Sequence, residues 1–272
     1  MDVYGLVGDP VEHSLSPPMH EAAYETLETD ARYVTFEPSE GDLDRAFAGS
    51  EALGVAGLNV TVPHKERALD LVEPDPLAAR IGAVNTVDLG PEPPTGHNTD
   101  AAGARRALAE GGADLDGATA VVVGAGGAGR AVTVGLTDAG ASVRVANRTV
   151  ERAERLVADV GGTGVATEVT AHPLDDLPAL LSDATVLVNA TTVGMEEDRS
   201  PVPAAALHDG LTVLDAVYRP RETRLLREAA DRGATTVDGG RMLLHQGAAT
   251  FERWTGHEPP VEAMATALAD RL

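Results

Sequence analysis

The chain of 272 residues lacks cysteine, has a single lysine and is poor in aromatic residues. The absence of cysteine excludes disulfide bonds, thiolate zinc sites and thiol nucleophiles, and it favours a reducing compartment, so we expect a cytoplasmic protein. Long apolar runs are also missing, because the most apolar stretch, ATAVVVGAGGAG, is short and rich in glycine. The first ten residues, MDVYGLVGDP, have no basic segment typical of a secretion signal. We therefore expect no membrane partner.

Positive charge is scarce as well. The chain has 43 acidic and 21 basic residues and a formal net charge of −22. Such an acidic surface argues against nucleic acid and anionic membranes as partners. Together with the near absence of lysine, it suggests a protein adapted to a cytoplasm of high salt, where self-repulsion is screened.

The length predicts two domains or one large α/β domain. Short apolar runs alternate with helical stretches, which is typical of a parallel α/β fold. We place one domain boundary between Asp100 and Gly117, and we expect the helical tail after Gly240 to pack on the first domain. The predicted strands are Val3–Val7, Tyr33–Phe36, Val55–Val62, Ala83–Leu89, Ala118–Gly124, Ser142–Ala146, Thr185–Asn189 and Leu211–Val217. The predicted helices of the first part follow Ser16, surround Leu43–Leu53 and follow His64.

A glycine pattern typical of dinucleotide binding follows one of these strands. Gly124, Gly126 and Gly129 spell GxGxxG at the point where an apolar strand gives way to a helix. In such a loop the glycines allow a tight turn, an approach of the backbone to a pyrophosphate, and close packing of helix on sheet. A glycine-rich turn without a ligand is the alternative, but the complete strand, loop, helix and strand favour binding.

The end of the next strand indicates which dinucleotide binds. An NAD site would carry Asp or Glu there to hold the ribose hydroxyls. The chain instead has Asn147, Arg148 and Thr149, followed by Arg152. Arginine pairs with phosphate through two parallel hydrogen bonds, so this end favours the 2′-phosphate of NADP. The alternative is that both arginines are solvated and pair with Glu151 or Glu154.

The single lysine is the strongest candidate for catalysis. Lys65 follows the apolar segment LNVTVPH and falls in the first turn of a predicted helix. Arginine occupies the other 20 basic positions, so position 65 requires an amine. An ammonium can give up its proton, as a general acid or base must, whereas arginine cannot.

Three further residues have both a structural and a functional interpretation. Asp100 precedes an alanine-rich helix and could cap it, but Asn98 or Thr99 could do so equally well, which would leave Asp100 free to face Lys65. Ser14 and Ser16 lie in HSLSPPMH, where Ser16 before proline resembles a capped helix start. Such a start can also bind a substrate carboxylate.

The motifs together resemble the shikimate dehydrogenase family over essentially the whole chain. They are, in order, HSLSPPMH, LNVTVPHKE, GAVNT, HNTDAAG, GAGGAGRA, NRT, NATTVGM, DAVYRP and GGRMLLHQG. The resemblance implies two domains: an α/β substrate-binding and catalytic domain of residues 1–100 and 241–272, and a Rossmann-type, doubly wound NADP-binding domain of residues 101–240. It implies reversible reduction of 3-dehydroshikimate to shikimate, a step of aromatic amino acid biosynthesis.

The same resemblance implies roles for individual residues. Lys65 and Asp100 would form the catalytic pair, and Ser14 and Ser16 would bind the substrate carboxylate. The ring hydroxyls or the carboxylate would be held by Thr61, Asn85, Tyr218 and Gln246. The cofactor would contact Gly124, Ala125, Gly126, Gly127, Ala128, Gly129, Asn147, Arg148, Thr149, Arg152 and the backbone near Ala216 and Gly239.

Other interpretations remain open. A quinate/shikimate dehydrogenase that uses NAD or a wider range of substrates is the nearest, and a non-catalytic NADP-binding regulator is another. A glutamyl-tRNA reductase is excluded because that enzyme needs a thiol. His64 departs from the aromatic residue often found in the family, and we expect it to pack or cap rather than act as an acid. The histidines show no metal-ligand spacing, and a homodimer is an expectation that no motif specifies.

Overall fold

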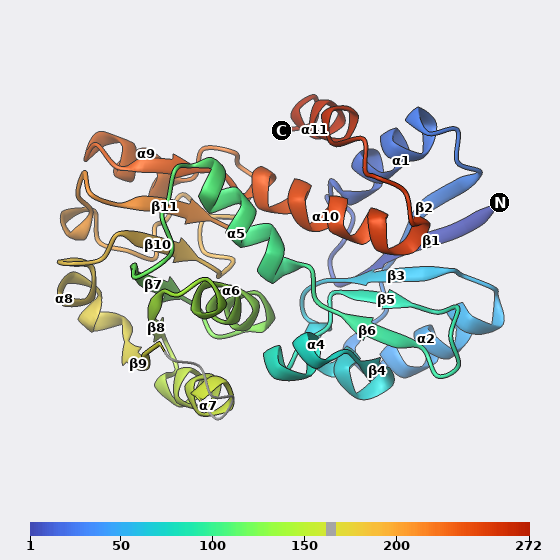
Figure 1. Cartoon of the computed structure of the whole chain (residues 1–272), viewed down its shortest axis with the longest axis horizontal. Coiled ribbons are helices and arrows are strands. Elements are labelled where there is room, and N and C mark those ends of the chain that lie inside the picture. The colour runs from blue at the N-terminus through green and yellow to red at the C-terminus, as the bar shows by residue number, and fades with distance from the viewer. Residues whose placement is uncertain (162–166) are drawn as a thin grey trace. The chain divides into compact units, whose positions relative to one another are not determined.

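The computed structural model describes residues 1–161 and 167–272, which divide into two compact units (Figure 1). Unit 1 comprises Met1–Thr99 and Gln246–Arg271, and unit 2 comprises Asp100–His245 with Leu272. The helix α10 (Gly239–Thr255) contributes residues to both units. No helix among the described residues is long and apolar enough to span a membrane.

Unit 1 is built on a mixed sheet of six strands in the order β2-β1-β3-β5-β6-β4. Strands β2, β1 and β3 are parallel, whereas β5 runs antiparallel to both β3 and β6. The strands are β1 (Asp2–Val7), β2 (Ala31–Phe36), β3 (Gly57–Val60), β4 (Glu73–Pro74), β5 (Thr86–Asp88) and β6 (Thr95–His97). The helices are α1 (Ser16–Thr26), α2 (Leu43–Ala52), α3 (Lys65–Ala68), α4 (Pro76–Ile81) and α11 (Val261–Ala269).

Alternation along β3 separates the two faces of this sheet. Leu58 and Val60 are buried in an apolar cluster with residues of α2, α3 and α4. Asn59 between them points to the opposite face, where its amide reaches the hydroxyl of Thr250 on α10 at 3.4 Å. That face also holds an aromatic group in which the rings of Tyr4 and Trp254 stack with centroids 4.6 Å apart. Helix α11 packs on α1 (Figure 1).

Unit 2 is built on an all-parallel sheet in the order β12-β11-β10-β7-β8-β9. Both faces are covered, since residues of α8 and α9 form one apolar cluster with the sheet, and α5 packs on α6 (Figure 1). The strands are β7 (Thr119–Val123), β8 (Ser142–Asn147), β9 (Val169–Pro173), β10 (Val186–Asn189), β11 (Thr212–Asp215) and β12 (Thr235–Val237). The helices are α5 (Asp100–Glu110), α6 (Gly127–Asp138), α7 (Val150–Gly161), α8 (Leu177–Leu181) and α9 (Arg224–Asp231).

These elements confirm the predicted α/β fold with two sheets. The runs Thr185–Asn189 and Leu211–Val217, predicted as buried parallel strands, form β10 and β11. The prediction was less accurate for short elements. The run Ala83–Leu89 contributes only β5, and β4 and β6 were not predicted, because strands of two or three residues leave no readable alternation and are held by their neighbours.

Candidate active site and cofactor loops

The polar residues of unit 1 gather at one edge of its sheet. Because β1, β3 and β6 run the same way and β5 runs opposite, the ends of the first three meet the start of β5. Thr61 follows β3 and donates its N–H to the Val7 carbonyl at 2.8 Å. Asn85 precedes β5, and its N–H reaches the His97 carbonyl at 3.0 Å. Thr61 and Asn85, both predicted to bind substrate, therefore lie at this edge.

Lys65 is fixed at the same edge by its backbone. It is half-buried in the first turn of α3, as predicted, and its carbonyl accepts the N–H of Val84 at 2.8 Å, next to Asn85. The neighbouring ring of His64 is 1% exposed, and its Nε2 lies 3.1 Å from the Pro38 carbonyl oxygen. His64 therefore packs against the loop of Pro38, which agrees with a structural role.

The serine segment enters α1 differently from a standard cap. The N-cap position is Leu15, and no side chain caps the helix, so Ser16 lies inside the first turn instead of before it. The hydroxyl oxygen of Ser14 accepts the N–H of Ser16 at 3.2 Å, which shapes the turn into the helix. Ser16 is not the cap, and its hydroxyl makes no hydrogen bond within residues 1–161 and 167–272, although the residue is only 5% exposed.

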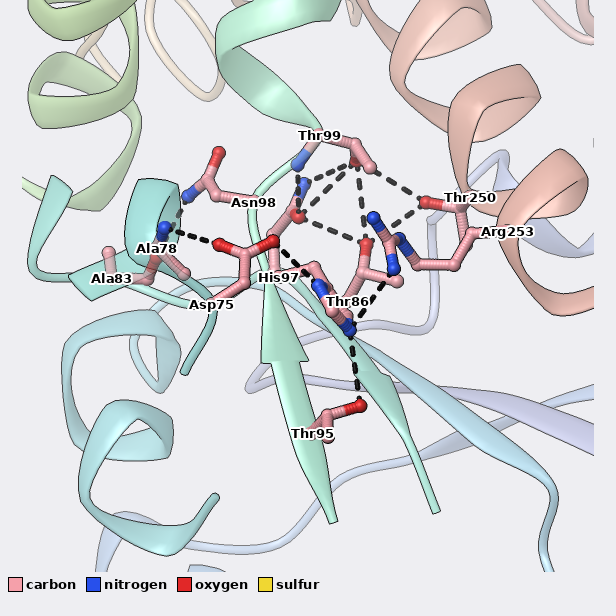
Figure 2. Close-up of polar contacts among 11 residues, drawn as sticks. Asp75, Ala78, Ala83, Thr86, Thr95, His97, Asn98, Thr99, Thr250 and Arg253 are labelled. Atoms are coloured by element: carbon pink, nitrogen blue, oxygen red, sulfur yellow. Dashed lines mark hydrogen bonds and ion pairs between the residues drawn. The ribbon is translucent and has the colours of Figure 1, made fainter. Parts of the chain in front are cut away.

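A buried hydrogen-bond network joins β5, the segment after β6, and α10 (Figure 2). Asn85 is its centre: its Oδ1 accepts the N–H of Thr99 at 2.8 Å, and its Nδ2 lies 3.0 Å from the Thr99 hydroxyl and 3.3 Å from Gln246 Oε1. The network continues through Thr86, whose hydroxyl lies 3.0 Å from that of Thr250. Asn85 and Gln246 are thus brought together as predicted partners of one site.

Sequence reasoning missed Asn59, Thr86, Thr99 and Thr250 as members of this network. Asn59 accepts the hydroxyl of Tyr33 at 2.8 Å and donates to the Asn85 carbonyl at 3.0 Å. The repeated Asn-Thr pair in GAVNT and GHNTD was a readable signal, because buried polar side chains need partners.

Asp100 is the first residue of α5 and is 4% exposed. The two residues proposed as alternative caps are engaged elsewhere: Asn98 donates to the Ala83 carbonyl at 3.0 Å, and the Thr99 hydroxyl belongs to the network around Asn85. Lys65 belongs to unit 1 and Asp100 to unit 2, so their pairing remains a prediction.

The glycine loop of unit 2 has the geometry of a dinucleotide site. Gly124 follows β7 with a φ of +112°, a backbone conformation that favours glycine. A Cβ at Gly129 would lie 2.1 Å from the Gly124 carbonyl oxygen, so no side chain fits there. Gly126 is the N-cap of α6, and a Cβ there would meet open space. The loop therefore leaves its backbone open to a ligand at the N-terminus of a helix of 12 residues.

The loop lies where the order of strands reverses. The chain runs from β7 outward to β8 and β9 and then returns to β10 on the other side of β7. Ligands of open parallel sheets bind outside the carboxyl ends of the strands at such a point. Ala190 after β10 borders it, since a Cβ at Gly124 would lie 3.1 Å from the Ala190 carbonyl oxygen. Ala125 belongs to the same loop, and Gly127 and Ala128 open the first turn of α6.

Two other predicted cofactor positions also meet in unit 2. A Cβ at Gly239, the first residue of α10, would lie 2.6 Å from the Ala216 carbonyl oxygen, so the two backbones touch. Ala216 in turn donates its N–H to the Asn189 carbonyl at 2.9 Å, at the end of β10. Tyr218 lies half-buried two residues further on.

The end of β8 presents the residues predicted to select NADP. The Asn147 amide donates to the Thr149 carbonyl at 2.8 Å, which turns the chain before α7, and Arg148 and Thr149 are exposed there. Arg152 is exposed in the first turn of α7. Of the two arginines in the alternative considered above, Arg148 forms no ion pair with Glu151 or Glu154 in the described part of the chain. Arg130 on α6 is paired with Asp159 at 2.6 Å.

Comparison with known proteins gives the same family over the whole length. Residues 6–87 match the shikimate dehydrogenase substrate binding domain, residues 106–196 match shikimate / quinate 5-dehydrogenase, and residues 239–269 match the shikimate 5′-dehydrogenase C-terminal domain. The NADP⁺-dependent shikimate dehydrogenase of Natronomonas pharaonis is 62% identical over 100% of both chains. The chain belongs to the shikimate dehydrogenase family.

Solved structures of the family have the same fold. A shikimate dehydrogenase in complex with NADP⁺ is 39% identical, with a TM-score of 0.92 over 99% of this chain and 95% of that one. The Thermus thermophilus enzyme in complex with NADP(H) and shikimate is 40% identical, with a TM-score of 0.89 over 100% of both chains. These matches confirm the resemblance, the two-domain α/β fold and the prediction of an NADP-dependent oxidoreductase.

One buried carboxylate in unit 2 of this family member was not predicted. Asp215 ends β11 and is 0% exposed, and it accepts hydrogen bonds from the Asn189 amide at 2.8 Å, the Val217 N–H at 3.0 Å and the Thr223 hydroxyl at 2.6 Å. Burial raises the pKa of Asp215 to about 6, against the effect of these hydrogen bonds. The carboxylate ties the loop that begins at Ala216 to the end of β10.

Proposed function

We propose that the protein catalyses the reversible NADPH-dependent reduction of 3-dehydroshikimate to shikimate. The observation that carries the proposal is the position of Lys65, the only lysine, half-buried at the polar edge of unit 1 beside Asn85. A residue whose amine can release a proton would thus serve at an edge where Thr61 and Asn85 offer hydroxyl and amide groups suited to a polyhydroxylated ring acid.

The residues of unit 2 fit NADP. The open glycine backbone at the start of α6 suits the pyrophosphate, and the exposed Arg148, Thr149 and Arg152 suit a 2′-phosphate where an NAD site would have a carboxylate. Bound NADPH supplies the hydride that reduces the ring carbonyl. The chain's own task is to hold the substrate in register and to move one proton.

Each catalytic role follows from the chemistry of the side chain. In reduction, the Lys65 ammonium donates its proton to the alkoxide oxygen that forms on the ring. In oxidation, the neutral amine accepts the hydroxyl proton, and Asp100 orients the amine and the hydroxyl. Ser14 and Ser16 bind the substrate carboxylate at the start of α1.

The substrate ring is held from several sides in this proposal. Hydrogen bonds to the ring hydroxyls or the carboxylate come from Thr61, Asn85, Tyr218 and Gln246.

We also infer a cytoplasmic location from the absence of cysteine. A homodimer stays a prediction, which a measurement of the molecular mass in molar salt would test.

The test of the catalytic lysine is Lys65→Ala together with Lys65→Arg. Because arginine keeps its proton, both variants should lose roughly 10²- to 10⁴-fold in turnover with shikimate and NADP⁺, whereas NADP⁺ affinity should stay unchanged. Arg67→Ala is the matched control, since Arg67 is exposed on the same helix and pairs with Asp44 and Asp70. Near-normal turnover of Lys65→Arg would rule out proton transfer by this residue.

The same assay separates the rival functions. Turnover is measured with quinate and NAD⁺ as well as with shikimate and NADP⁺. A preference for quinate and NAD⁺ would show that the protein is a quinate dehydrogenase instead. A wild-type protein that binds NADP⁺ but oxidises neither alcohol would be a non-catalytic NADP-binding protein.

A further inference from the structure

A histidine in contact with a carboxylate lies at the outer end of the polar network in unit 1 (Figure 2). The Asp75 carboxylate and His97 Nδ1 are 2.7 Å apart, and His97 Nε2 lies 3.1 Å from the Thr95 hydroxyl and 3.2 Å from Arg253 Nη1. The His97 side chain is 11% exposed, that of Asp75 26%, and Arg253 is exposed. The three charged or ionisable groups thus run from the surface into the unit.

The partners determine which nitrogen of His97 carries the proton. A carboxylate can only accept a hydrogen bond, so Nδ1 must donate to Asp75. A guanidinium can only donate, so Nε2 must accept from Arg253, and the Thr95 hydroxyl can donate to the same lone pair. Burial favours a raised pKa for Asp75, but the hydrogen bonds from His97 and the Ala78 N–H hold the pKa below its usual value.

Asp75 also anchors this arrangement to the fold. Its second carboxylate oxygen accepts the Ala78 N–H at 2.7 Å and caps α4, and its own N–H donates to the Gly96 carbonyl at 2.8 Å. The imidazole of His97 is therefore held from the start of α4, while the backbone of His97 accepts the N–H of Asn85.

Helix α10 links His97 to the residues proposed to bind the substrate. Gln246, Thr250 and Arg253 are four and three residues apart, so they lie along one face of the helix. Thr250 contacts the Thr99 hydroxyl at 3.3 Å, two residues beyond His97. The helix thus makes three polar contacts along this face. The contact of Arg253 with His97 is the outermost, and the contact of Gln246 with Asn85 and Thr99 is the innermost.

We propose that Asp75, His97 and Arg253 act as positioning residues, which set the rotation of α10 and so place Gln246 and Asn85 for the substrate ring. This proposal rests on the proposed function, because it assigns those two side chains to shikimate. None of the three residues is placed in contact with the substrate. Their loss should weaken substrate binding without changing the chemical step.

The first test is Arg253→Met with Arg253→Lys. Methionine keeps the aliphatic length but cannot donate to Nε2, whereas lysine can. We expect Arg253→Met to raise the KM for shikimate by roughly five- to tenfold, the effect of one misplaced hydrogen bond, with kcat and the NADP⁺ Kd unchanged. Arg253→Lys should restore the wild-type KM. Arg45→Met, an exposed arginine of α2 paired with Asp42 at 2.7 Å, is the matched control and should change nothing.

The second test is Asp75→Asn, alone and with Arg253→Met. Asparagine can still cap α4, but its amide must donate to Nδ1, so the Nε2 of His97 becomes a donor that faces Arg253. We expect Asp75→Asn to raise the KM as Arg253→Met does, and the double variant to be no worse than either single variant, because the same contact is lost once.

The outcomes distinguish this proposal from the proposed function. A wild-type protein without shikimate oxidation refutes the function. Active variants with an unchanged KM, whatever happens to their melting temperatures, refute the positioning role, and so does an additive increase in KM in the double variant.

Discussion

The buried histidine of α1 should make the protein sensitive to mild acid. His20 is 0% exposed, its ring stacks on Tyr33 with centroids 4.5 Å apart, and neither ring nitrogen has a hydrogen-bond partner among the described residues. Burial lowers its pKa from 6.5 to about 3. The folded protein therefore holds His20 neutral where an unfolded chain would protonate it.

The sign and size of the effect follow from linkage. Since the unfolded state binds the extra proton, the contribution of His20 to stability is full above the unfolded pKa of 6.5 and is lost as the pH falls toward about 3. With about 1.4 kcal/mol for each pKa unit, the loss between pH 7 and pH 5 is about 2 kcal/mol. The whole shift, with a folded pKa of about 3, would amount to about 5 kcal/mol.

The perturbation that tests this is His20→Phe, which keeps a ring on Tyr33 and cannot take a proton. Urea unfolding at fixed molar salt, measured at pH 7, 6 and 5, should show the wild type losing about 2 kcal/mol more than the variant over this range. His257→Phe, the same change at an exposed position, should behave as the wild type. If the wild type and His20→Phe lose stability in parallel between pH 7 and 5, His20 is not the responsible group.

Two further predictions concern the cofactor and salt. Arg148→Gln should raise the KM for NADP⁺ by about 10- to 100-fold, as expected for loss of a charge-assisted hydrogen bond, and leave the KM for NAD⁺ unchanged. Arg155→Gln, on the helix α7 that follows Arg148, is the control, and equal effects of Arg148→Gln on both cofactors would contradict a 2′-phosphate contact. With a net charge of −22, screening of about 3 kcal/mol of self-repulsion should raise the Tm by roughly 10 °C from low to molar KCl, whereas a constant Tm would remove the salt-adaptation hypothesis.

The features that could be predicted from the sequence are those written in neighbouring residues. The glycines 124, 126 and 129 follow an apolar run, and Lys65 stands out because arginine takes the other basic positions. Both signals are local, so they placed the cofactor loop at the end of β7 and the lysine in the first turn of α3.

The remaining features depend on contacts between distant residues. His97 pairs with Asp75 across 22 positions and with Arg253 across 156, and no local pattern relates such positions. The prediction that Ser16 caps α1 was wrong for a related reason. Ser16 before proline has the pattern of a cap, but the turn that Ser14 makes with the Ser16 N–H moves the start of the helix by one residue.

The polar face of α10 restricts the number of residues in this helix as well as their identity. One residue inserted between Gly247 and Thr250 would rotate Thr250 and Arg253 by about 100° about the helix axis relative to Gln246. The contact of Thr250 with Thr99 and that of Arg253 with His97 would then be lost together, even though no side chain had been replaced. Substitutions on the solvent side of this helix can accumulate one at a time, but insertions and deletions in it cannot.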